Sequence, residues 1–91
     1  MEDKGRWPTW WEWELELTPH LLKRMVDRRF TEVELRAMLQ TARGHREDIV
    51  EGRYVISCRH RRRPWHVIIE PDATVQRLVV ITAYPSESGR Q

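Results

Sequence analysis

The stretch "PWHVIIEPDATVQRLVVITAYP", residues 64–85, indicates a β-hairpin. Apolar and β-branched residues fill both halves, and a Pro-Asp-Ala turn at residues 71–73 separates them. This pattern predicts strands over residues 65–70 and 77–84. Because the connection is short, the two strands should be antiparallel neighbours.

The sequence before this hairpin predicts two more strands. Residues 53–60 are apolar enough for one, and the basic residues 61–64 connect it to the hairpin. Trp and Leu alternate with Glu over residues 11–17, which is typical of a half-buried strand, here at a sheet edge. Residues 45–52 are polar, so we expect a loop there.

Two helices are predicted between these strands. Thr18-Pro19 is a helix start, because Thr can cap free backbone donors and Pro suits the first helical position. Thr31 and Glu34 have the spacing of a capping box at a second start, and Gly44 follows this helix. The residues predicted to face the core are Leu21, Leu22, Met25 and Val26 in the first helix, and Leu35, Met38, Leu39 and Ala42 in the second.

The predicted element order is β-α-α-β-β-β. We therefore expect an α+β fold in which two helices pack on one face of a four-stranded, mostly antiparallel sheet. A chain of 91 residues has room for one domain. We place that domain at residues 11–85, after a flexible Trp-containing lead-in at residues 1–10 and before a mobile tail at residues 86–91.

Composition narrows the class of protein. The longest unbroken apolar run covers residues 78–81, so no membrane partner is expected. The N-terminus lacks the apolar core of a signal peptide, and the single cysteine, Cys58, cannot form an internal disulfide. These features predict a cytoplasmic protein, with Cys58 as a small buried residue.

Arginine dominates the positive charge. The chain has fourteen arginines and two lysines, and residues 18–91 carry an excess of bases over acids. The planar guanidinium matches phosphate, so RNA is a candidate partner. A GC-rich genome or a hot habitat could also enrich arginine without any functional meaning.

Several motifs together resemble a known family. His20, Arg24, Met25 and Arg28 form H-x-x-x-R-M-x-x-R, and Phe30-Thr31 and the hairpin follow. Over residues 16–85 these resemble a widespread bacterial family of small domains of unknown function, which is grouped with RelE/ParE-like and BrnT-like toxins. The resemblance implies a RelE-like fold, an RNA-cleaving ancestry and a small antitoxin partner.

One departure from the family concerns the end of the first helix. The family usually has Gly where this chain has Arg29. If this position is left-handed, Arg29 is strained by about 1 kcal/mol; alternatively, the helix end differs in shape from that of the family.

The first helix has a polar stripe suited to RNA cleavage. His20, Arg24, Asp27 and Arg28 fall at i, i+4, i+7 and i+8, on one side of the helix. Cleavage without metal needs a base, an acid and cations for the phosphorane. His20 is therefore a catalytic candidate, and Arg24 and Arg28 are phosphate ligands. The alternative is a solvated surface on which the Asp27 carboxylate pairs with Arg24 or another basic side chain nearby.

The hairpin carries a second polar group. Alternation places His66, Ile68 and Glu70 on one side of their strand, and Val80, Thr82 and Tyr84 on one side of theirs. If the register aligns these sides, His66 and Tyr84 are further acid–base candidates, and Thr82 can orient a neighbour. Alternatively, they are ordinary half-buried sheet residues.

Further arginines are candidates for binding phosphate. Arg53 and Arg61 are the two that we select, and Arg61 belongs to the basic turn "RHRRRP", residues 59–64. The turn could equally be a solvated connection, or bind an acidic protein. Cys58, His60 and His66 could bind zinc, but their spacing is no recognised ligand pattern, so we predict no metal and no cofactor.

Two functions from different classes follow. The first is a RelE-like, toxin-related domain that binds RNA and cleaves it without metal through His, Tyr and Arg side chains. The second is a non-catalytic module that keeps the fold and binds RNA, an acidic protein or a second copy of itself. The Trp-rich start and the edge strand favour a homodimer in the second case.

Overall fold

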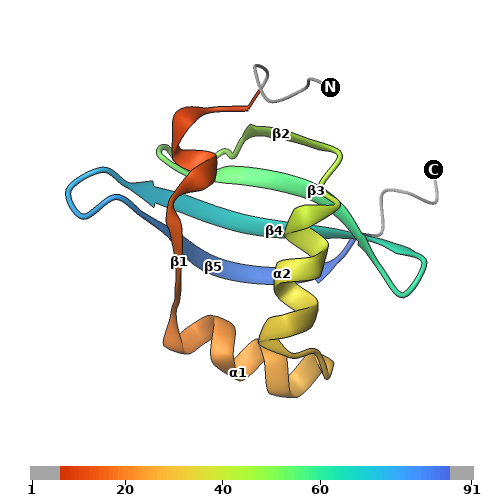
Figure 1. Ribbon diagram of the computed structural model, residues 1–91. Helices are drawn as coiled ribbons and strands as arrows, with labels where there is room; N and C mark the ends of the chain where they lie inside the picture. The colour runs from red at the N-terminus through yellow and green to blue at the C-terminus, as the bar shows by residue number, and fades with distance from the viewer. Residues whose placement is uncertain (1–6, 87–91) are drawn as a thin grey trace.

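The computed structural model describes residues 7–86. These residues form one α+β unit with two α-helices, a short 3₁₀-helix and five strands (Figure 1). No helix of this part of the chain is long and apolar enough to cross a membrane. Residues 1–6 and 87–91, which belong to the predicted lead-in and tail, lie outside the described residues. The elements in chain order are η2 (Thr9–Glu12), β1 (Glu14–Leu17), α1 (Pro19–Arg28), α2 (Glu32–Gln40), β2 (Gly44–Glu47), β3 (Tyr54–His60), β4 (Arg63–Asp72) and β5 (Arg77–Pro85).

The five strands form one mixed sheet in the order β1-β5-β4-β3-β2. The prediction of four strands is therefore wrong by one, because residues 45–52 are not all loop. Gly44–Glu47 pairs antiparallel with β3 and forms an edge strand. This strand has little apolar character of its own, so its backbone pairing with β3 determines it rather than a sequence pattern.

The first strand lies at the opposite edge, as predicted. It pairs parallel to β5, with Leu15 opposite Leu78. The strand is shorter than the alternation over residues 11–17 suggests, because Thr9–Glu12 forms the 3₁₀-helix. The tryptophans pack together rather than projecting singly: Trp7 stacks on Trp11 with ring centroids 4.4 Å apart, and Trp10 lies 4.8 Å from the ring of Tyr54.

Local signals fix both helix starts as predicted. The Thr18 hydroxyl accepts a hydrogen bond from the Leu21 amide at 3.1 Å. Thr31 and Glu34 form a reciprocal capping box, with bonds of 3.2 and 2.9 Å. Arg29, after α1, is left-handed at φ 59° and ψ 53°, which is the conformation that a glycine would adopt without strain.

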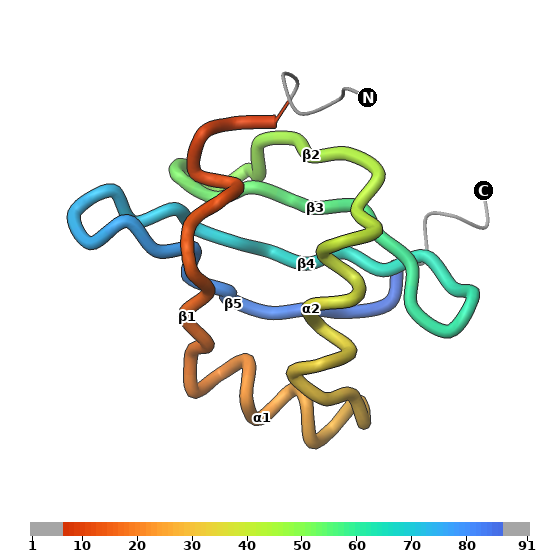
Figure 2. Tube along the Cα trace, in the orientation of Figure 1, coloured from red at the N-terminus to blue at the C-terminus, as the bar shows by residue number. Residues whose placement is uncertain are grey.

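The two helices are placed differently relative to the sheet. α2 lies across one face, whereas α1 lies alongside β5, beyond the point where β1 ends (Figures 1 and 2). Two contacts hold α1 there: the Thr18 hydroxyl donates to the Val80 carbonyl at 2.9 Å, and Arg28 Nη1 donates to the Ala83 carbonyl at 3.3 Å. A helix at a sheet edge buries a narrow stripe, so the prediction that Leu22 and Val26 face the core is wrong; they are 48% and 77% exposed.

The core lies between α2, α1 and the near face of the sheet. Cys58 belongs to it and is 3% exposed, as predicted; burial raises the pKa of its thiol to about 11. A thiol with so high a pKa is a packing group at neutral pH rather than a nucleophile. The buried residues of this cluster are Leu21, Phe30, Leu35, Met38, Leu39, Ile56, Cys58, Trp65, Val67, Ile69, Leu78, Val80 and Ala83.

Candidate functional site: the uncovered face of the sheet

The face of the sheet opposite α2 carries most of the polar candidates, and we call it the uncovered face. Of the two α-helices within residues 7–86, α2 crosses the other face and α1 lies beside β5 (Figure 1). Its central rows contain Ser57 on β3, His66 and Ile68 on β4, and Thr82 and Tyr84 on β5. Core side chains such as Val67 on β4 and Ala83 on β5 point toward α2. The residues that alternate with them along each strand therefore point away from α2.

A β-bulge in β5 decides which residues reach this face. Ile68 pairs with Thr82, but Ile69 pairs with Val80, so Ile81 is an extra residue without a partner in the ladder. The expectation that Val80 shares a face with Thr82 and Tyr84 is therefore wrong. Val80 is fully buried in the core, because the extra residue reverses the alternation.

His66 and Tyr84 lie directly opposite each other on β4 and β5. Their ring centroids are 5.7 Å apart, with planes at 82°. Thr82 lies one pair further along, and Ser57 lies opposite His66 on the other side. The hairpin register thus aligns the three polar residues that the alternation singled out.

The surroundings of His66 favour its neutral form. Partial burial lowers the pKa of His66, and the positive charge of Arg46 lowers it further. A neutral imidazole at neutral pH can accept a proton. Arg46 and Ser57 were missed by sequence analysis: Arg46 falls in the segment expected to be a loop, whereas alternation with Ile56 and Cys58 could have placed Ser57 on this face.

The polar stripe of α1 flanks β5, but its members differ in their contacts. Arg28 reaches the Ala83 carbonyl, next to Tyr84 in the sequence. Arg24 Nη1 lies 3.2 Å from Asp27 Oδ2 in an exposed pair, which is the alternative expected for this stripe. His20 is exposed in the first turn and has no hydrogen bond or ion pair within residues 7–86.

The two remaining phosphate candidates lie apart from each other. Arg53 Nε contacts Glu70 Oε1 at 3.0 Å, toward the end of the hairpin that is remote from His66. Arg61, in the β3–β4 turn, contacts Glu34 Oε2 at 3.2 Å and the Arg29 carbonyl at 3.5 Å. Arg61 is therefore held on the helical side of the molecule and does not join His66 and Tyr84.

The register of β3 and β4 separates the three residues that could have bound zinc. Cys58 and His60 project toward the covered side, where His60 packs against Phe30 and Trp65, whereas His66 lies on the uncovered face. A single ion cannot bind all three side chains. Over the described residues, no cluster of three or more His, Cys, Asp or Glu side chains has a geometry suited to a metal.

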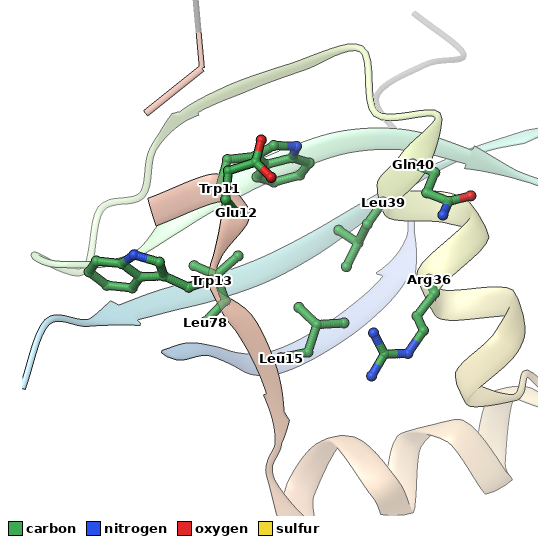
Figure 3. A pocket seen from close by; sticks show the side chains of 8 residues that line it. All are labelled: Trp11, Glu12, Trp13, Leu15, Arg36, Leu39, Gln40 and Leu78. Atoms are coloured by element: carbon green, nitrogen blue, oxygen red, sulfur yellow. The ribbon is translucent and has the colours of Figure 1, made fainter. Parts of the chain in front are cut away.

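A separate hollow of about 360 Å³ opens on the covered side, between the Trp-rich start and α2 (Figure 3). Its polar groups come from Glu12, Arg36 and Gln40. Arg36 is already paired with Glu32 at 2.9 Å, so this guanidinium is not free for a ligand. The full lining is Trp11, Glu12, Trp13, Leu15, Arg36, Leu39, Gln40 and Leu78.

Comparison with known proteins identifies the family but no characterised relative. A family model described as a domain of unknown function, DUF4258, matches residues 17–85. No curated protein and no solved structure shows significant similarity to the chain. The match begins at the end of β1 and includes α1, α2 and the strands β2 to β5. Because it covers well over half of the sequence, the chain belongs to the DUF4258 family of domains of unknown function.

Proposed function

We propose that the protein binds single-stranded RNA on the uncovered face and cleaves it without a metal ion, as a RelE-like, toxin-related endoribonuclease. The observation that carries the proposal is the His66–Tyr84 pair, a proton acceptor and a hydroxyl donor facing each other on an open sheet surface. The resemblance noted in the sequence supports the same activity. The resemblance also supports a small antitoxin as partner, and the composition of the chain supports a cytoplasmic site of action.

The proposed reaction uses the 2′-hydroxyl of the RNA itself as the nucleophile. His66 accepts the proton of this hydroxyl, and the 2′-oxygen attacks the adjacent phosphorus. The bond from phosphorus to the 5′-oxygen breaks, and the Tyr84 hydroxyl gives its proton to that oxygen. The products are a 2′,3′-cyclic phosphate and a 5′-hydroxyl, with no other reactant consumed.

The neighbouring cations suit the charge that develops in this step. Arg46 is near enough to His66 to influence its pKa, and Arg28 lies beside β5. Guanidinium groups so placed stabilise the negatively charged phosphorane. Arg24 is paired with Asp27, and Arg53 is paired with Glu70. Each arginine would have to break its ion pair before it could contact a phosphate. We therefore assign these two arginines to phosphates that flank the cleaved one. Aromatic rings at His66 and Tyr84 also offer surfaces for stacking an unpaired base.

A second candidate function is RNA binding without cleavage. The observation that favours it is the state of the remaining basic candidates: Arg24, Arg53 and Arg61 are paired with carboxylates. Such a protein can still bind RNA through Arg62 and Arg63 of the turn at residues 59–64, whose side chains have no carboxylate partner within residues 7–86. In this case the chain keeps the fold as a binding module, alone or as a homodimer.

Cleavage of a fluorescent single-stranded RNA by purified protein distinguishes the two functions. We expect wild-type protein to give cyclic-phosphate products in the presence of EDTA, and His66→Gln and Tyr84→Phe each to slow cleavage by about 10²–10⁴-fold. His20→Gln is the matched histidine control and tests the other catalytic candidate. Loss of activity in His20→Gln alone would move the site to α1. Salt-sensitive binding with no cleavage by wild-type protein would support the binding module.

A further inference from the structure

The first helix exposes large apolar side chains near its junction with the second helix. Val26 is 77% exposed and Leu22 is 48% exposed, and both lie on α1. Together with a hollow of about 460 Å³, they form what we call the α1–α2 hollow. Contiguous exposed apolar surface of this kind often marks an interaction site. The hollow is lined by Leu22, Met25, Val26, Arg29, Phe30 and Thr31.

The geometry of α1 makes this surface a continuous stripe. Leu22 and Val26 are four residues apart and therefore lie one turn above the other. Met25 and Phe30 line the hollow with them, and Phe30 is only 3% exposed. A row of apolar side chains spaced by one helical turn is the shape that receives the apolar stripe of another helix.

Charge around the hollow indicates which kind of helix fits. Lys23 and Arg29 border the stripe, and neither has a carboxylate partner within residues 7–86. The nearby acids are already neutralised: Asp27 pairs with Arg24, Glu32 with Arg36 and Glu34 with Arg61. The rim is therefore positive, so it favours a partner with acidic groups.

We propose that the α1–α2 hollow binds an amphipathic helix of another protein, with an apolar stripe flanked by Glu or Asp. A second copy of this chain fits less well, because a two-fold contact here would bring Lys23 and Arg29 of both copies together. This inference does not depend on RNA cleavage, since the hollow and the His66–Tyr84 pair are built from different elements.

The test uses two synthetic helix-forming peptides of about 18 residues. Both carry leucine at alternating spacings of three and four, and the remaining surface positions are glutamate-rich in one and lysine-rich in the other. We expect the acidic peptide to bind the full chain at least about tenfold more tightly in fluorescence anisotropy. Leu22→Ser and Val26→Ser should each weaken its binding about tenfold, and Lys23→Glu should weaken it several-fold.

The matched control is Ile49→Ser, since Ile49 is 98% exposed in the β2–β3 loop, outside the hollow. Its binding of the acidic peptide should equal that of wild-type protein. Equal binding of the two peptides, no binding of either, or full binding by Val26→Ser would overturn the proposal. A dimer in sedimentation that Val26→Ser abolishes would also overturn it, in favour of a second copy. RNA cleavage by the same variants, measured in parallel, separates failure here from failure of the catalytic proposal.

Discussion

The two faces of the β4–β5 hairpin are made from alternate residues of the same strands, yet two neighbouring cross-strand pairs differ in burial and polarity. Val67 and Ala83 pair on the covered face and are fully buried. One residue along each strand, His66 and Tyr84 pair on the uncovered face, where both are half-buried. The comparison teaches that period-two alternation lets one segment supply both the core and the candidate chemistry, with little interference between them.

The largest expected effect is on stability. Ile69→Ala empties a fully buried position on the covered face and should lower the free energy of unfolding by about 2–5 kcal/mol. His66→Gln on the uncovered face should change it by less than about 1 kcal/mol, because the site is half-buried and polar. Urea unfolding followed by tryptophan fluorescence measures both. Similar losses for the two variants would mean that the faces are not energetically distinct.

Thiol reactivity sharpens the same comparison between adjacent residues of one strand. Cys58 faces the core, and its pKa of about 11 should make it react with an aromatic disulfide reagent about a hundredfold more slowly than an ordinary thiol at pH 8. The variant Ser57→Cys adds a thiol on the uncovered face, which should react at close to the ordinary rate. Two equally slow thiols would show that Ser57 is not accessible.

A smaller effect on the free energy of unfolding is expected at the end of α1, where the backbone of Arg29 is strained and neither face of the sheet is involved. Arg29 adopts a left-handed conformation, so Arg29→Gly should raise the free energy of unfolding by about 1 kcal/mol. Thermal unfolding of the two proteins measures the gain. A loss of stability instead would mean that the contacts of the Arg29 side chain outweigh its backbone strain.

The smallest expected effect is a shift in a single titration. The pKa of His66 should lie below its ordinary value of 6.5, chiefly through burial and also through Arg46. Because folding favours neutral His66, its contribution to stability is intact above pH 6.5 and is lost as pH falls toward the folded pKa. Arg46→Gln removes a nearby positive charge and should raise the pKa of His66, measured by NMR. A pKa above 6.5 in wild-type protein would contradict the environment described.

Sequence reasoning succeeded where short-range interactions determine the structure. The caps at Thr18 and Thr31 depend on residues within one turn, and both were predicted correctly. The glycine of the resembling family raised a left-handed conformation at Arg29 as one of two alternatives, and the structure has this one. The short turn and the two apolar runs predicted the β4–β5 hairpin itself, whereas the alignment of His66 with Tyr84 was a condition, which the register meets.

The errors share a long-range cause. β2 exists because β3 offers an unpaired edge, and the parallel pairing of β1 joins residues far apart in sequence. The bulge at Ile81 and the position of α1 beside β5 likewise depend on tertiary packing. Periodicity could not reveal that the apolar residues Leu22 and Val26 remain exposed. Arg46 was missed for the same reason, because it belongs to the unrecognised strand.

NMR mapping with a short single-stranded RNA shows whether RNA engages the uncovered face, as we propose. In an assigned spectrum of the full chain, we expect the largest chemical-shift changes at His66, Thr82 and Tyr84, with much smaller changes at core positions of α2. These changes should diminish at high salt. Changes confined to the α1–α2 hollow, or none at any RNA concentration, would contradict the account.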